Sequence, residues 1–172
     1  MKQYLVMTVL GDDSSGLVKL LSEIIVAHQG EWVESNMSHL SGKFAGILRI
    51  NLPVKNIDDF CQHLSESKLG LQVAFERVRL KEVPIKMNAY TLDLIGQDQL
   101  GIVNKLSSAL ANIQVNVEQL NTEVIEASMS GEQLFKANIM LSVPINISEE
   151  NLQDALVSIA DELTLDLELQ KK

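Results

Sequence analysis

Residues 10–18 of the 172-residue chain read Leu10-Gly11-Asp12-Asp13-Ser14-Ser15-Gly16-Leu17-Val18, and residues 95–103 read Ile95-Gly96-Gln97-Asp98-Gln99-Leu100-Gly101-Ile102-Val103. The two stretches share a glycine, an aspartate two residues later, a second glycine and then a valine, about 85 positions apart. A repeat whose period is about half of the chain length indicates a tandem duplication of one small domain. The sequence therefore predicts two copies of the same fold.

Each copy of the stretch follows a run of apolar residues that is typical of a strand. The first glycine, Gly11 or Gly96, is expected to allow a sharp reversal of the backbone, and the second, Gly16 or Gly101, to let another backbone approach closely. The aspartate between the two glycines is expected to cap the helix that follows. Such a turn is either a plain connection between strand and helix or a place where backbone N–H groups bind a small anion or carboxylate.

Hydrophobic periodicity extends this pattern through the first half of the chain. Residues 4–10 are apolar on both faces, which suits a central strand buried beneath helices. A helix is predicted from Leu17 to His28, with Gly30 as its stop. The remaining predicted elements are a strand 32–40, the tight turn Ser41-Gly42-Lys43, a strand 44–52, a helix from about Ile57 to Gly70, and a strand 71–80.

The second half repeats the same order. Its predicted elements are a strand 90–95, a helix 102–113, a strand 115–127, a turn near 128–131, a strand 134–143, a helix that opens at Ser148-Glu149-Glu150, and a strand 165–169. We therefore predict an α+β protein made of two tandem ferredoxin-like β-α-β-β-α-β sandwiches, each an antiparallel sheet with helices on one face. The expected domains are 1–82 and 87–172, and the short link 81–86 predicts that the two copies pack closely.

Composition limits the possible partners and compartments. A formal net charge of −9 with only three arginines argues against direct binding of DNA or RNA, which requires clusters of Lys and Arg. The single cysteine, Cys61, excludes an internal disulfide and is consistent with a reducing compartment. The N-terminus has no signal-peptide pattern, and no apolar run approaches the ~18 residues of a membrane helix. We expect a cytoplasmic protein without a membrane or nucleic-acid partner.

The pattern Gly-x-Asp-x-x-Gly-[Leu/Ile]-Val between the first strand and first helix of a β-α-β-β-α-β unit resembles the ACT domain family. ACT domains are regulatory modules that bind amino acids. The match is incomplete, because the Asp-Arg-Pro-Gly that usually ends the turn is Asp13-Ser14-Ser15-Gly16 here and Asp98-Gln99-Leu100-Gly101 in the second copy. An ACT unit often begins its second strand with Asn-Val, as Asn116-Val117 does, whereas the first copy has Glu31-Trp32.

Two such units filling the chain, with residues 34–44 forming the first central hairpin, resemble the family of glycine cleavage system transcriptional repressors. This resemblance implies a protein without a DNA-binding domain that acts through a DNA-binding activator, with glycine as the signal. The acidic charge agrees with indirect action. A homo-oligomer is also expected, because ACT units generally pair their edges or helices and an unpaired edge strand favours association.

A bound amino acid would present one carboxylate and one ammonium group. Backbone N–H groups at the start of the first helix can hold the carboxylate, and asparagine side chains on the second strand can hold the ammonium. The candidate ligand-binding residues of the first copy are Gly11, Asp12, Asp13, Ser14, Ser15, Gly16, Leu17 and Asn36. Those of the second copy are Gly96, Gln97, Asp98, Gln99, Leu100, Gly101, Ile102, Asn116 and Asn121. An alternative is that the asparagines cap turns or face solvent.

The sequence gives little support to an enzyme. His28, His39 and His63 are widely spaced and have no cysteine partner, so no metal is expected, and no cofactor is expected either. Cys61 lies on an apolar helix face and is expected to be a small core residue. Three hypotheses follow: an amino-acid-binding regulator, an interaction module that has lost its ligand sites and, more remotely, a small-molecule enzyme.

Overall fold

The structure is a computed structural model that describes residues 1–67, 69–78, 86–127 and 131–172. The chain forms two compact units, Met1–Glu82 and Val83–Lys172, and each is considered by itself. Most of the link 81–86 and of the turn near 128–131 lies outside the described residues. The domain limits 1–82 and 87–172, and close packing of the two copies, therefore stay predictions.

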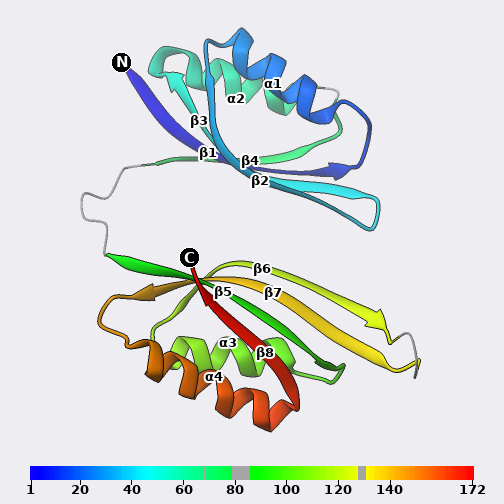
Figure 1. Ribbon diagram of the computed structural model, residues 1–172. Coiled ribbons are helices and arrows are strands. Elements are labelled where there is room, and N and C mark those ends of the chain that lie inside the picture. Colours follow the sequence, from blue (N-terminus) through cyan, green and yellow to red (C-terminus); the bar gives the residue numbers. More distant parts are fainter. Residues whose placement is uncertain (68, 79–85, 128–130) are drawn as a thin grey trace. The chain divides into compact units, whose positions relative to one another are not determined.

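The first unit has the predicted order of elements. They are β1 (Lys2–Asp12), α1 (Leu17–Ala27), β2 (Glu31–Leu40), β3 (Lys43–Pro53), a 3-10 turn η1 (Val54–Asn56), α2 (Ile57–Glu66) and β4 (Gln72–Arg77). The strands form one antiparallel sheet in the order β2-β3-β1-β4. Both helices cover the same face of this sheet (Figure 1).

The second unit repeats this arrangement. Its elements are β5 (Met87–Gln97), α3 (Ile102–Asn112), β6 (Asn116–Glu126), β7 (Gln133–Pro144), α4 (Glu149–Leu163) and β8 (Leu165–Lys171). The sheet order is β6-β7-β5-β8, again antiparallel, with α3 and α4 on one face (Figure 1). The predicted α+β class, two tandem ferredoxin-like sandwiches, is confirmed.

Alternation along β1 defines the two faces of the first sheet. Leu5, Met7 and Val9 are only 1–2% exposed and pack in the core beneath the helices. Thr8 between them is exposed. Because successive strand residues point to opposite faces, Thr8 and its neighbours across the sheet lie on the face without helices, here called the open face. The strand is central, as predicted, but helices cover only one of its faces.

The end of α1 differs from the prediction. The residue in the left-handed conformation is Gln29 (φ 61°) and not Gly30. The N–H of Gly30 donates to the carbonyl of Ile25 (2.9 Å) and that of Gln29 to the carbonyl of Val26 (2.9 Å), which is the Schellman pattern of a helix end. Gly30 is required for space instead, because a Cβ there would lie 2.9 Å from the carbonyl oxygen of Ile25.

The start of α4 is the best-capped helix end in the described chain. The hydroxyl of Ser148 accepts a hydrogen bond from the N–H of Asn151 (3.2 Å), and Glu149 and Glu150 follow in the first turn, as predicted. Replacing Ser148 with alanine should lower the free energy of unfolding of the second unit by about 1 kcal/mol. Urea unfolding followed by circular dichroism measures this. Ser148→Asp is the control, since aspartate also caps; equal losses for both variants would contradict the capping role.

The hairpin between the second and third strands is one place where the two units differ in length. Ser41 (φ 50°) and Gly42 (φ 76°) alone connect β2 to β3, as in a type I′ turn. In the second unit β6 ends at Glu126 and β7 begins at Gln133. The ladder from the first to the third strand is nevertheless equivalent in both units. Over the first three strands, the difference in length is therefore confined to the tip of the hairpin.

Candidate functional site

The two glycines of each turn have exchanged roles relative to the prediction. Gly11 lies inside β1, paired with Phe44, and its φ is not positive. A Cβ on Gly11 would come within 2.8 Å of the carbonyl oxygen of Gly70. Gly16, in contrast, has φ +92° and open space around it. The first glycine thus permits close approach and the second permits the left-handed backbone, so the predicted assignment was wrong.

The second copy shows the same exchange. Gly96 lies inside β5, and a Cβ there would be 2.5 Å from Cδ2 of Leu165 and 2.8 Å from the carbonyl oxygen of Thr164. Gly101 has φ +89°, and a Cβ at this position would have nothing within 4 Å. Each helix begins directly after this left-handed glycine, at the buried residue Leu17 in α1 and Ile102 in α3.

The N-termini of α1 and α3 carry no side-chain cap. Gly16 and Gly101 occupy the N-cap positions, and neither helix has an acidic residue in its first turn. The predicted capping by Asp13 and Asp98 is therefore wrong. By comparison, α2 has Asp58 in its first turn and α4 has its serine cap and two glutamates. The first-turn N–H groups of α1 and α3 are left without a side-chain acceptor, which suits an anion.

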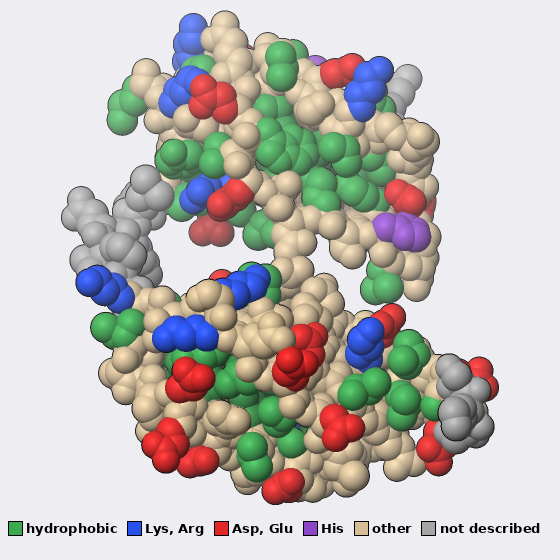
Figure 2. Space-filling model, in the orientation of Figure 1, with side chains coloured by type: hydrophobic (Ala, Val, Ile, Leu, Met, Phe, Trp, Pro, Cys, Tyr) green, Lys and Arg blue, Asp and Glu red, His purple; other side chains and the backbone are tan. Residues whose placement is uncertain are grey.

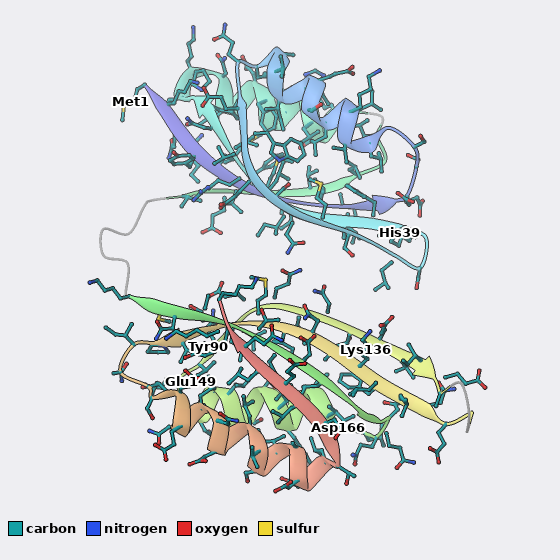
Figure 3. All side chains as sticks on the ribbon, in the orientation of Figure 1. Met1, His39, Tyr90, Lys136, Glu149 and Asp166 are labelled. Carbon is teal, nitrogen blue, oxygen red and sulfur yellow. The ribbon has the colours of Figure 1, made fainter. Side chains whose placement is uncertain are left out.

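The first turn is held to the β2–β3 hairpin by three contacts. The N–H of Asp13 donates to the carbonyl of Gly42 (3.0 Å), and the ammonium group of Lys43 bonds the carboxylate of Asp12. His39, near the end of the hairpin (Figure 3), places Nε2 3.6 Å from Oδ2 of Asp13. The hydrogen bond from Lys43 lowers the pKa of Asp12 below its ordinary value. Both carboxylates beside this helix start thus have a basic neighbour.

The second turn is held differently. The N–H of Asp98 donates to the carbonyl of Gln133 (2.9 Å), which parallels the first unit. The side chain of Gln99, however, donates to the carbonyl of Leu163 at the end of α4 (2.6 Å). Leu100 is fully exposed. The exposed serines of the first turn are thus replaced by a tethered amide and an exposed apolar side chain.

The asparagines lie away from the turns within their own units. Asn36 pairs with Ile47, which pairs with Thr8, so Asn36 is on the open face, four positions along the ladder from Asp12. Asn121 takes the equivalent place in the second sheet, opposite Asn138. Asn116 is the first residue of β6 and donates to Glu118 (2.9 Å). The turns and the asparagines are therefore separate features of each unit.

Concave surface occurs on the open faces, beside these asparagines. In the first unit a shallow pocket of about 280 Å³ is lined by Asn36, Glu34 and Arg49, among others. In the second unit a pocket of about 300 Å³ is lined by Asn121 and Lys136, among others. Glu34 and Arg49 are not among the site residues predicted from the sequence. Counting outward from the two-residue turn at Ser41-Gly42 would have placed them opposite each other.

His28 and Cys61, which were considered for metal binding or catalysis, have the surroundings of residues that stabilise the fold. His28 follows the end of α1, where Nδ1 lies 2.9 Å from the carbonyl oxygen of Ile24 and the ring packs edge-on against Phe60 at 5.6 Å. Burial raises the pKa of the Cys61 thiol, with a smaller effect from Asp58, which disfavours a reactive thiolate. Among the described residues no group of three or more His, Cys, Asp or Glu side chains could hold a metal ion. Nor is any helix of the described chain long and apolar enough to cross a membrane.

Comparison with known proteins agrees with the fold. Residues 3–76 match the sequence model of the ACT domain. No curated protein matches the chain. Among solved structures, an unknown protein from Galdieria sulphuraria is 27% identical, with a TM-score of 0.89 over 100% of this chain and 99% of its own. A "putative glycine cleavage system transcriptional repressor" is 18% identical, with a TM-score of 0.72 over 100% of this chain and 98% of its own.

These matches and the geometry lead to one assignment. The ACT model matches within the first unit, the second unit repeats the same strand order, and the two structural matches extend over the whole chain. The first unit therefore matches the ACT domain, and the chain as a whole has a tandem ACT-like fold.

Proposed function

We propose that this protein is a non-enzymatic, cytoplasmic regulator that binds a small amino acid, glycine first among the candidates. The observation that carries the proposal is the pair of helix N-termini without side-chain caps, at α1 and α3. The carboxylate of an amino acid can accept hydrogen bonds from such N–H groups and interacts favourably with the positive end of the helix dipole. Gly11–Leu17 and Gly96–Ile102 are the proposed carboxylate sites.

The proposed output is control of glycine cleavage genes through a DNA-binding partner protein. Support comes from the full-length likeness to the protein named as a putative repressor of that system. Charge gives further support, because residues 83–172 contain thirteen acidic and five basic residues, whereas residues 1–82 contain ten and nine. Asp and Glu side chains are spread over the visible face of the second unit (Figure 2). Such a surface disfavours nucleic acid and suits a basic patch on a protein.

Regulation requires that the ligand distinguish two states of the protein. An amino acid can shift the contact with the partner only by its difference in affinity for those states.

The described strands β2, β4, β6 and β8 are each at one edge of a sheet in their own unit. Pairing of such edges between chains would give the expected homo-oligomer.

A thermal-shift screen of the full chain against the twenty amino acids tests the proposal. A ligand at a hundredfold excess over its dissociation constant stabilises the folded state by about 2.7 kcal/mol, so Tm should rise by several degrees. Glycine or another small amino acid is expected to give this rise. If none of the twenty does, the interaction module without a ligand is favoured instead.

The control must block the turns without unfolding the units. Valine at Gly11 and Gly96 is unsuitable, because both positions lack room for a side chain. We choose Ser15→Asp with Leu100→Asp, since both residues are exposed and the new carboxylates would compete with the ligand for the same N–H groups. The matched uncharged variant is Ser15→Asn with Leu100→Asn. The aspartate pair should abolish the shift, and the asparagine pair should largely keep it.

A further inference from the structure

The shallow pocket on the open face of the first sheet brings a cation and an anion together. Glu34 of β2 lies directly opposite Arg49 of β3 in the ladder, and Oε1 of Glu34 is 3.1 Å from Nε of Arg49. Asn36 lines the same pocket, whose apolar part includes Val6 and Ile47. The positive charge of Arg49 and the negative charge of Glu34 complement the carboxylate and the ammonium group of a zwitterion.

The guanidinium group of Arg49 is held in place but retains free donors. Its Cζ lies 5.2 Å from the centroid of the Tyr4 ring, a cation–π contact that favours this position of the group. Nε is buried, and its approach to Glu34 lacks hydrogen-bond geometry. Within the described residues the group donates no hydrogen bond. The remaining N–H groups form a fork that matches a carboxylate.

We propose that this pocket is a second binding site for a small α-amino acid, distinct from the helix N-termini. The ligand carboxylate accepts hydrogen bonds from the guanidinium fork of Arg49. Its ammonium group donates to the carboxylate of Glu34 and to the amide oxygen of Asn36. The ligand side chain lies against Val6 and Ile47.

The size and exposure of the pocket agree with this ligand. Its volume of about 280 Å³ is just below the range of pockets that hold drug-sized molecules, so a small ligand fits best. The side chains of Arg49 and Glu34 are 31% and 63% exposed. A half-exposed ion pair contributes little to stability, so a ligand can replace the contact between Arg49 and Glu34 at little cost in folding free energy.

The second unit provides an internal comparison. At the ladder positions of Glu34 and Arg49 it has Gln119 and Met140, while Asn121 is retained opposite Asn138. The paired Glu and Arg side chains are therefore replaced at these two ladder positions, and the charges nearby are arranged differently: Lys172 Nζ lies 3.9 Å from Sδ of Met140, and Asp93 accepts a hydrogen bond from Asn138 (2.7 Å). The proposal predicts one such site per chain, in the first unit alone.

Calorimetric titration with glycine, then alanine and serine, tests the site in the full chain that carries Ser15→Asp and Leu100→Asp. In this background the helix N-termini are blocked, and binding of one ligand per chain should remain. Adding Arg49→Met or Glu34→Gln, which installs the residues of the second unit, should weaken that binding at least about tenfold, as expected for losing a hydrogen bond to a charged group. Arg49→Lys should weaken it less, because it keeps the charge and loses the fork.

The matched control is Lys136→Met, which removes the cation of an exposed ion pair from the open face of the second unit, where Lys136 Nζ lies 3.4 Å from Glu123 Oε1 (Figure 3). It should leave the remaining binding unchanged. The second site is overturned if the blocked background binds none of the three amino acids, or if Arg49→Met and Glu34→Gln bind as the background does. Neither result affects the helix N-termini, whose binding is read in the unblocked chain.

Discussion

Replacing Phe60 with alanine is expected to destabilise the first unit by about 3–5 kcal/mol, a large part of the stability of a small domain. Phe60 is completely buried, and its ring packs edge-on against Phe75 with centroids 6.1 Å apart and against His28 at 5.6 Å. Truncation removes these contacts and leaves a cavity between α2 and the sheet. The cost depends on how far the surroundings can close over that cavity.

The two units can be followed separately in this experiment. Trp32 is the only tryptophan of the chain and packs against the core of the first unit. Its fluorescence during urea unfolding reports the first unit, whereas circular dichroism reports both. The fluorescence midpoint should fall sharply in Phe60→Ala, and Val26→Ala, at a residue 70% exposed, should shift stability by no more than about 0.5 kcal/mol. Similar shifts for the two variants would show that Phe60 does not anchor the core.

Replacing Gly96 with alanine is expected to destabilise the second unit by about 3 kcal/mol, the upper end of the cost of overpacking. The added Cβ would lie 2.8 Å from the carbonyl oxygen of Thr164 and 3.1 Å from Cα of Leu165, and these backbone atoms can yield only by moving β8. The change should appear in circular dichroism, while the fluorescence of Trp32 should not change.

Gly101 provides the comparison, because glycine is required there for its backbone conformation and not for lack of space. Its φ is +89° and space is open, and asparagine tolerates the left-handed region better than other residues with a side chain. Gly101→Asn should therefore cost less than about 1 kcal/mol and Gly101→Ala about 1–2 kcal/mol. At Gly96 asparagine should be at least as damaging as alanine. If asparagine cost less stability than alanine at Gly96 but not at Gly101, the roles assigned to the two glycines would have to be reversed.

The fold could be predicted from the sequence because its determinants are local and occur twice. Apolar residues alternate with polar ones in 135–143 and recur at helical spacing in 152–163. The strand and the helix lie where these patterns predict them, and each buries its apolar face. The roles of Gly11 and Gly16 could not be assigned, because close approach and a left-handed backbone both require glycine. Only the neighbouring chain, such as Gly70 beside Gly11, distinguishes the two causes.

The candidate sites were predictable only in part. The turns could be predicted because they repeat. That Asp13 does not cap α1 could not be predicted, because this depends on where the hairpin holds that residue. Asn36 lies on the second strand, as predicted, but the ladder places it on the open face, four positions from Asp12, so it does not share a site with the turn of its own unit. Arg49 and Glu34 are fifteen residues apart, and their relation depends on the register set by Ser41 and Gly42. A shift of one residue would have moved each to the other face.

The hairpin tip has a consequence for how the two copies diverge. All of the length difference between the first three strands of the units lies between Leu40 and Lys43 in one copy and between Ile125 and Leu134 in the other. Because the ladders on both sides are unchanged, an insertion or deletion at this tip leaves the core intact. In evolutionary terms, a duplicated copy can change the surface beside its helix start by single genetic events that selection for folding does not oppose.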